Sequence, residues 1–298
     1  MSAFDLDGYL KDRRALVDAA LERLLPGEDA PPPTVHRAMR YSVLAGGKRL
    51  RPILVIAGAE AVGAPAATVM PTACALEVIH TYSLIHDDLP AMDDDAYRRG
   101  RLTNHKVFGD AVAILAGDAL LTLAFKLVAE NAALVTDARV VCDVVAAIAE
   151  ASGTNGMVGG QVVDIESEGK AVTAETLEYI HRNKTAALLR ASLWAGVRLG
   201  GGDAAALAAI NEAGQSLGLA FQIVDDILDV EGSLEALGKT AGSDARKQKA
   251  TYPALHGLEA SRREARRLID EAKSRLTVFG DRATPIRALA DFIVERKS

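Results

Sequence analysis

Two clusters of aspartates are the residues in this sequence best suited to chemistry. The first lies in HDDLPAMDDD and contributes Asp87, Asp88 and Asp93. The second lies in FQIVDDILDV and contributes Asp225, Asp226 and Asp229. Apolar runs flank both clusters, and a carboxylate in apolar surroundings needs a counter-charge or hydrogen-bond donors. Basic side chains or divalent cations would meet that need, whereas the neighbouring Asp94 and Asp95 are interpreted as solvated surface charges.

The spacing of these aspartates fits helices that face a shared site. Asp225 and Asp229 are four residues apart, so on a helix they lie on one face, where like charges repel by a few tenths of a kcal/mol. Pro90 removes a backbone donor, so the first helix is expected to distort or end there. On an ideal helix Asp87 and Asp93 would lie roughly 120° apart. A distorted turn would bring Asp93 back beside Asp87.

The chemistry of these side chains favours magnesium. Oxygen ligands without nearby cysteines are typical of magnesium rather than zinc sites. Magnesium usually binds one or two carboxylates together with water and substrate phosphates. The two clusters therefore predict one site where several magnesium ions bridge the protein to a diphosphate. Cations that could hold a diphosphate occur in GGKRLRP (46–52), RRG (98–100), NKT (183–185) and LGKTAGSD (237–244).

The elements that must position these residues are predicted to be helices. Hydrophobic residues make up 49% of the chain and aromatic residues only 4%, and a chain rich in Ala and Leu favours helix. Periodicity predicts helices over about 5–25, 34–44, 53–62, 66–86, 110–130, 137–168, 173–200, 203–230, 258–279 and 284–296. Residues 26–33 are expected to be a linker and 89–108 a loop or distorted helix. No shift in composition marks a second domain, so residues 1–298 are expected to form one all-α domain.

Composition also limits the partners. The formal net charge of −6 argues against a nucleic-acid partner, because phosphate backbones select basic faces. No signal-peptide core is visible, and the longest apolar stretches are interrupted by charges or glycines, so no membrane span is expected. Cys74 and Cys142 lie in separate apolar runs and are expected to be buried, reduced thiols. A cytoplasmic location is the resulting expectation.

Taken together, these motifs resemble the trans-isoprenyl diphosphate synthases, close to bacterial farnesyl and plant-type geranylgeranyl diphosphate synthases. The resemblance covers nearly the whole chain, because GGKRLRP, SLIHDDLPAMDDD, LAGDALLTLAF, GGQVVDI, KTAALL, FQIVDDILDV, GKTAGSD and KATYPAL match in order. Two aspartate motifs with lysines between and after them are highly specific. The resemblance implies a single all-helical bundle of the isoprenoid-synthase type around a deep central cavity, usually in a homodimer. Ala96-Tyr97 departs from the family pattern before the paired arginines.

The resemblance also implies a role for each motif residue. Three magnesium ions on the allylic diphosphate would be bound by Asp87, Asp93 and Asp225, with support from Asp88, Asp226 and Asp229. The allylic substrate would be contacted by Arg98, Lys184, Thr185, Gln222 and Lys239. Isopentenyl diphosphate would be held by Lys48, Arg51, His80 and Arg99. The residues expected to carry catalysis are Asp87, Asp88, Asp93, Arg98, Lys184, Asp225 and Lys239.

The implied reaction joins isopentenyl diphosphate head to tail with dimethylallyl or geranyl diphosphate. The allylic diphosphate leaves, the isopentenyl double bond attacks the carbocation, and the departing diphosphate takes the proton. Ser83 lies one turn before Asp87, about 40° from its face of an ideal helix. The family places the cavity floor at the aromatic residue five positions before the motif, which is Tyr82. Its large ring favours farnesyl diphosphate, with a geranylgeranyl diphosphate synthase as the alternative.

Three further readings remain as alternatives. A terpene cyclase shares the first aspartate motif but typically carries an Asn/Ser/Glu metal motif in place of the second. A non-catalytic subunit of the same fold would usually have lost aspartates or phosphate-binding cations, all of which are present here. GGGDAA (200–205) fits a dinucleotide-binding fingerprint, but that motif needs a preceding strand. The flanking helices instead indicate a glycine turn.

Overall fold

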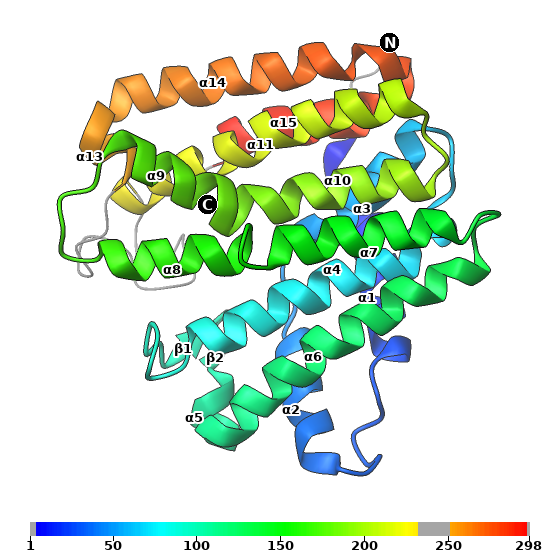
Figure 1. The fold of residues 1–298 in the computed structure, drawn as a ribbon, viewed down its shortest axis with the longest axis vertical. Coiled ribbons are helices and arrows are strands. Elements are labelled where there is room, and N and C mark those ends of the chain that lie inside the picture. The colour runs from blue at the N-terminus through cyan, green and yellow to red at the C-terminus, as the bar shows by residue number, and fades with distance from the viewer. Residues whose placement is uncertain (1–3, 232–250, 297–298) are drawn as a thin grey trace.

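The chain folds into a bundle of helices, as the composition predicted (Figure 1). The computed structural model describes residues 4–231 and 251–296. Its α-helices are α1 (Leu6–Leu24), α2 (Pro33–Val43), α3 (Leu50–Ala61), α4 (Ala66–Asp87), α5 (Asn104–Phe108), α6 (Asp110–Glu130), α7 (Arg139–Ser152), α8 (Met157–Ser167), α9 (Ala174–Ile180), α10 (Ala187–Leu199), α11 (Ala204–Glu231), α13 (Tyr252–His256), α14 (Leu258–Arg275) and α15 (Thr284–Glu295). Shorter helical segments are η1 (Asn131–Ala133), η2 (His181–Ala186) and η3 (Leu276–Ala283). The all-α prediction is confirmed.

Two predicted helices differ from the structure. The helix expected over 137–168 is interrupted between α7 and α8, where Gly153 and Gly156 flank a turn. The turn residues Gly, Thr and Asn favour such a break over continued helix. The helix expected over 173–200 is present but contains a π-helical segment, η2. Because π-helical turns are rare and often lie at functional sites, this segment is a candidate part of the functional site.

The segment 89–108, expected to be a loop or distorted helix, contains a small hairpin. Strands β1 (Tyr97–Arg98) and β2 (Arg101–Leu102) pair antiparallel. The two residues between them, Arg99 and Gly100, have φ angles of 53° and 74°. Positive φ at both central residues is the hallmark of a type I′ turn, which matches the twist of a hairpin. The first acidic cluster is therefore followed by an ordered turn that places two arginines.

Helix α4 passes through Pro71 with help from a side chain outside the helix. A proline inside a helix removes one backbone hydrogen bond and strains the preceding turn. Asn131 in η1 spans this turn, because its Oδ1 accepts from the Thr72 backbone N–H at 3.0 Å and from the Thr72 hydroxyl at 2.6 Å. Its side-chain nitrogen donates to the Thr68 carbonyl. The start of α4 is thus tied to the end of α6.

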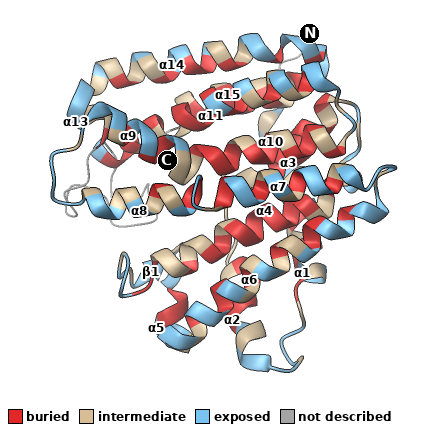
Figure 2. Ribbon diagram, in the orientation of Figure 1, coloured by how far each residue is buried: buried red, intermediate tan, exposed pale blue. Residues whose placement is uncertain are grey.

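The hydrophobic core consists of two clusters that meet along α3 and α10. One joins these helices to α4, α6 and α7, and the other joins them to α11, α14 and α15. In Figure 2 the buried residues form stripes along the helix faces that point inward, and α14 is exposed along its outer side. Helices α4 and α11, which carry the two acidic clusters, are both anchored by extensively buried residues.

Helix α6 qualifies the expectation that no segment could cross a membrane. The stretch Asp110–Ala133 is long and apolar enough by length and composition, and 39% of its most apolar window is buried. Core helices of water-soluble proteins meet the same criterion. Since α6 packs against α4 and α2 within the bundle, this finding is weak evidence for a span.

The two cysteines differ in their surroundings. Cys74 on α4 is fully buried, as expected. Cys142 on α7 is exposed, so the expectation of burial is wrong for this residue. It lies within a run of valines, but a helix turns successive side chains by about 100°. Its neighbours Val141 and Val144 therefore face the core while Cys142 faces outward.

Candidate active site

The first acidic cluster lies where α4 ends. Its last helical residue is Asp87, and Pro90 lies in the turn that follows. The chain then curls back, so that the backbone N–H of Asp93 donates to the carbonyl oxygen of Asp87 at 2.8 Å. The distorted turn expected from Pro90 is present, and it returns Asp93 to Asp87. Asp94 is exposed, as the sequence indicated, and lies 3.7 Å from Lys106.

The carboxylate of Asp87 faces a cavity of about 670 Å³. Other residues predicted for the site line the same cavity: Arg51, His80, Tyr82, Ser83, Arg98, Arg99, Lys184, Thr185 and Asp225. The structure therefore brings carboxylates of α4 and α11 to one cavity, together with the cations of the hairpin and of η2. Phe221 on α11 lines it as well.

A second cavity, of about 800 Å³, adjoins the first. It is lined by Lys48, together with Arg49, Arg296 and residues of α1 and α15. The two cavities share four residues, Arg51, His80, Arg99 and Phe221. The residues predicted for isopentenyl diphosphate thus surround the second cavity, at its boundary with the carboxylate-bearing one.

Arg51 and His80 give the shared wall its electrostatic character. Burial lowers the pKa of Arg51 to about 10, although Glu77 and Asp225 oppose this effect. The Nε of Arg51 has no hydrogen-bond partner among the described residues. Burial, reinforced by the nearby Arg51 and Arg99, lowers the pKa of His80 well below its usual value, so its ring is neutral. A buried arginine donor without a partner is suited to an anionic ligand.

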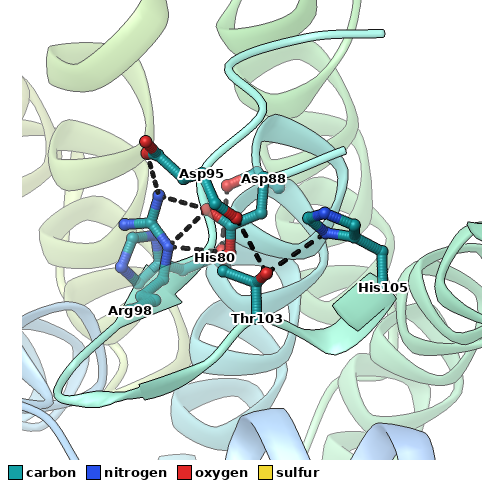
Figure 3. A network of polar contacts seen from close by, with 7 residues as sticks. His80, Asp88, Asp95, Arg98, Thr103 and His105 are labelled. Atoms are coloured by element: carbon teal, nitrogen blue, oxygen red, sulfur yellow. Dashed lines mark hydrogen bonds and ion pairs between the residues drawn. The ribbon is translucent and has the colours of Figure 1, made fainter. Parts of the chain in front are cut away.

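In each acidic cluster, one carboxylate faces away from the cavity. Asp88 is 3% exposed and accepts from Arg98, whose Nε and Nη2 lie 2.8 and 2.6 Å from its Oδ1 (Figure 3). Burial raises the pKa of Asp88, while Arg98 opposes the rise. Arg98 also lies 3.8 Å from Asp95, and the Asp95 carbonyl accepts from Thr103. Asp88 is therefore placed to orient Arg98.

The corresponding residue of the second cluster, Asp226, also accepts hydrogen bonds from other residues of the protein. It is 4% exposed and accepts from the backbone N–H of Tyr252 at 2.7 Å and from Gln222 at 3.1 Å. The Nε2 of His181 lies 3.2 Å from Oδ2, the oxygen that accepts from Tyr252. Gln222, predicted to contact the allylic substrate, thus holds this carboxylate. Asp229 is 7% exposed, and its Oδ1 has no hydrogen-bond partner among the described residues.

Asp225 faces the cavity beside the end of the chain. The Nη2 of Arg296 donates to its Oδ1 at 2.7 Å and to the Phe221 carbonyl at 3.0 Å. The guanidinium also lies 4.1 Å from the centre of the Phe221 ring. Arg296 is a site residue that the sequence analysis missed, because nothing in the sequence relates position 296 to position 225.

Lys184 reaches the cavity from the π-helical segment η2. Its Nζ donates to Asp164 on α8 at 2.6 Å. Helix α8 approaches closely because Gly160 has no side chain, since a Cβ there would lie 2.3 Å from the backbone N of Lys184. Asp164 was not predicted, although GGQVVDI was recognised as a motif. The sequence signal that could have identified Asp164 is an acidic residue among the valines of an amphipathic helix.

Arg49 proves to be structural, although it lies between two cations predicted to bind phosphate. It is 2% exposed and has a φ of 52°. Its three nitrogens donate to Asp18 at 2.8 Å, to Glu77 at 2.7 Å and to the Val43 carbonyl at 2.8 Å. These partners lie on three different helices. Arg49 therefore fixes the turn that presents its neighbours Lys48 and Arg51 to the cavities.

The residues around Asp87 fit a divalent cation. Burial raises the pKa of Asp87 to about 6, with Lys184 opposing the rise and Asp93 adding to it. A cation bound between these carboxylates would remove that repulsion. In the part of the chain that the structure describes, no group of three His, Cys, Asp or Glu side chains is placed to hold a metal ion by itself. Magnesium usually binds one or two carboxylates and completes its shell with water and substrate phosphates. Lys239 lies outside the described residues.

Comparison with known proteins identifies the family of this chain. A family described as polyprenyl synthetase matches residues 32–278. The chain belongs to this family. Among its relatives, the geranylgeranyl diphosphate synthase of Cyanophora paradoxa is 47% identical over 99% of this chain and 98% of the relative. The farnesyl diphosphate synthase of Geobacillus stearothermophilus is 47% identical over 93% of each chain.

Solved structures of polyprenyl synthetases show the same arrangement of helices. The farnesyl/geranylfarnesyl diphosphate synthase of Zymomonas mobilis superposes with a TM-score of 0.88 at 37% identity, covering 97% of this chain and 99% of the other. The geranylgeranyl pyrophosphate synthetase of Pyrococcus horikoshii gives a TM-score of 0.88 at 33% identity over 98% of both. This polyprenyl synthetase is a short-chain trans-prenyltransferase, as the motifs predicted.

Proposed function

We propose that this prenyltransferase condenses isopentenyl diphosphate with dimethylallyl and then geranyl diphosphate to give farnesyl diphosphate. The observation that carries the product length is the position of Tyr82, which lies one and a half turns before Asp87 on α4 and lines the same cavity. Its ring is 7% exposed. A large, packed ring at this depth would stop a growing prenyl chain early, which favours a short product.

The allylic diphosphate is proposed to bind among the carboxylates and cations of the first cavity. Asp87 and Asp225, which line this cavity, and Asp93, whose backbone N–H donates to Asp87, would hold magnesium, with three ions expected in the loaded enzyme. Lys184 and Arg98 would contact the phosphate oxygens. Bound magnesium would supply stabilisation of the negative charge that develops on the leaving diphosphate. Asp164 and Asp88 would hold these two cations in place.

The second cavity is proposed to hold isopentenyl diphosphate. Lys48, Arg51 and Arg99 would bind its diphosphate, and the neutral His80 would donate a hydrogen bond without adding charge. The isopentenyl double bond would then face the first cavity across the wall that the two share. The departing diphosphate is proposed to take the proton, as the resemblance to the family implies.

The test is product analysis by mass spectrometry after incubation with isopentenyl diphosphate, magnesium and each allylic primer. Farnesyl diphosphate is expected as the main product, and Tyr82→Ala is expected to lengthen it. An unchanged product profile in that variant would remove Tyr82 from the proposal. Cyclic hydrocarbons instead of linear diphosphates would support a terpene cyclase.

A specific observation favours geranylgeranyl diphosphate as the second candidate. Several close relatives, including those of Capsicum annuum and Catharanthus roseus, are named geranylgeranyl pyrophosphate synthases. The product of the unmodified enzyme with geranyl diphosphate as primer distinguishes fifteen from twenty carbons.

A homodimer in the cytoplasm completes the proposal. Helix α6 exposes the large side chains of Ile114 and Leu115, which are 43% and 58% exposed. An exposed apolar face of this kind fits a second copy of the chain. Sedimentation of the purified protein would test the dimer, and a monomer at all concentrations would contradict it.

A further inference from the structure

His86 lines the first cavity but has no role in the proposed chemistry. It lies one turn after Tyr82 on α4, so the two side chains share a face of the helix. Their ring centres are 5.7 Å apart with planes at 79°, an edge-to-face contact. Edge-to-face contact is a preferred arrangement of aromatic rings. The ring predicted to form the cavity floor is therefore held by a second ring above it.

The position of His86 is set by α6. A Cβ at Gly117 would lie 2.1 Å from its Nε2 and 2.5 Å from its Cδ2, so the ring rests where only glycine leaves room. The same Nε2 lies 3.1 Å from the carbonyl oxygen of Ile114. Because a carbonyl can only accept, Nε2 carries the proton in this contact. Helix α6 thus holds the ring by shape and by one hydrogen bond.

We propose that His86, positioned by Gly117, determines product length together with Tyr82. This inference rests on the proposed prenyltransferase reaction and adds a specificity residue to it. His86 lines the cavity from the part of α4 that contacts α6, and Val158 and Val162 on α8 line the cavity as well. A prenyl chain that grows past Asp87 would meet the His86 and Tyr82 rings, which contact each other edge to face, on the α4 side of the cavity.

The contact between Gly117 and His86 predicts opposite effects for two substitutions. His86→Ala removes the upper ring and frees Tyr82, so the main product is expected to lengthen by one five-carbon unit. Gly117→Ala places a methyl group where the ring lies, and the ring has to swing away from α6 toward the cavity. That variant is expected to shorten the main product by one five-carbon unit.

The double variant Gly117→Ala/His86→Ala separates the proposed contact from a general disturbance of α6. The three atoms nearest to the added methyl group all belong to the His86 ring, so without the ring the double variant is expected to match His86→Ala. If the methyl group acts through the helix itself, the double variant will resemble Gly117→Ala. That result would overturn the proposal.

The experiment incubates each purified enzyme with isopentenyl diphosphate, magnesium and dimethylallyl diphosphate, and reads product length by mass spectrometry. Thr122→Ala, on the exposed side of α6, is the control and should leave the product unchanged. Thermal unfolding of every variant identifies any that fail to fold. If the Gly117→Ala variants do not fold, the test uses His86→Ala alone. An unchanged product from folded His86→Ala refutes the inference. An unmodified enzyme that makes no prenyl product refutes the proposed function instead.

Discussion

Each acidic motif begins with a pair of adjacent aspartates, and the two members of each pair have different surroundings. Asp87 and Asp225 face the cavity, whereas Asp88 and Asp226 are buried among partners within the protein. Successive residues on a helix point about 100° apart, so the two carboxylates of each pair point in different directions. One carboxylate of each pair therefore lines the cavity while the other holds neighbouring protein groups.

Loss of either cavity-facing carboxylate is expected to abolish activity. Asp87→Ala and Asp225→Ala each remove a side chain proposed to hold magnesium, so the leaving diphosphate would lose charge stabilisation. Turnover should fall by at least about 10²-fold, as for loss of a major electrostatic group. Steady-state rates at saturating magnesium measure this, and circular dichroism checks the fold. Comparable turnover in either folded variant would contradict the proposed site.

The raised pKa of Asp87 predicts a stability that depends on pH. Burial raises this pKa from 3.8 to about 6, so ionisation costs more in the folded than in the unfolded protein. The contribution of Asp87 to the free energy of unfolding is fully present below pH 3.8, where the carboxyl group is protonated in both the folded and the unfolded protein. It is lost as the pH rises through about 6. The full difference corresponds to about 3 kcal/mol.

Asp87→Asn, which stays neutral, is therefore expected to be more stable than the native protein at pH 8 without magnesium. The gain should be about 2–3 kcal/mol at pH 8 and shrink to about 1 kcal/mol at pH 4.5. Urea unfolding in the presence of a chelator at both pH values measures it. The same gain at both values would show that ionisation of Asp87 is not the cause.

At the scale of elements, irregular segments place much of the site. The turn after α4 returns Asp93, the hairpin presents Arg98 and Arg99, and the π-helical segment presents Lys184. The regular helices supply the frame to which these segments are attached. The hairpin and the π-helical segment were not predicted: the sequence analysis expected a loop or distorted helix over 89–108 and an uninterrupted helix over 173–200.

The tie between Asn131 and the start of α4 predicts a loss of stability on truncation. Asn131→Ala leaves the buried N–H and hydroxyl of Thr72 without their acceptor. Unsatisfied buried groups of this kind cost about 1–3 kcal/mol. Urea unfolding should report that loss, and Asn155→Ala in the exposed turn after α7 is the matched control. An equal effect of both substitutions would show that Asn131 has no special role.

At the scale of the whole molecule, the residue that follows α15 reaches the second acidic cluster. Arg296 follows α15 and donates to Asp225 on α11, while α1 lines the neighbouring cavity. The two ends of the described chain therefore border the cavity proposed for isopentenyl diphosphate. A cation on Asp225 competes with any metal ion that binds there, since both need the same carboxylate.

Removal of Arg296 is therefore expected to strengthen magnesium binding. Arg296→Met should lower the magnesium concentration needed for half-saturation in the presence of an unreactive allylic diphosphate analogue, measured by calorimetry. Arg263→Met, on the exposed side of α14, makes the same change in net charge and should leave that concentration unaltered. Weaker or equal binding in Arg296→Met would mean that Arg296 does not compete for Asp225.

The sequence by itself determined the helical fold, the family and many of the charged residues that line the two cavities. Ala- and Leu-rich periodicity fixes helices, and short motifs such as DDLPAMD and DDILD retain their chemistry wherever they are placed. The return of Asp93 could be foreseen because Pro90 acts locally on its own turn. The helices, the chemistry of the motifs and the turn after Pro90 each depend on residues that are close together in the sequence.

Only the tertiary structure decided which residue of a motif faces the ligand and which faces the protein. Arg49 and Arg51 have the same charge and lie two positions apart, yet one is held by three helices and the other lines both cavities. Arg296 meets Asp225, Asp164 meets Lys184, and Gly117 admits His86, through contacts between segments far apart in the chain. Such pairings depend on how helices pack and cross, and no local pattern in a single sequence encodes them.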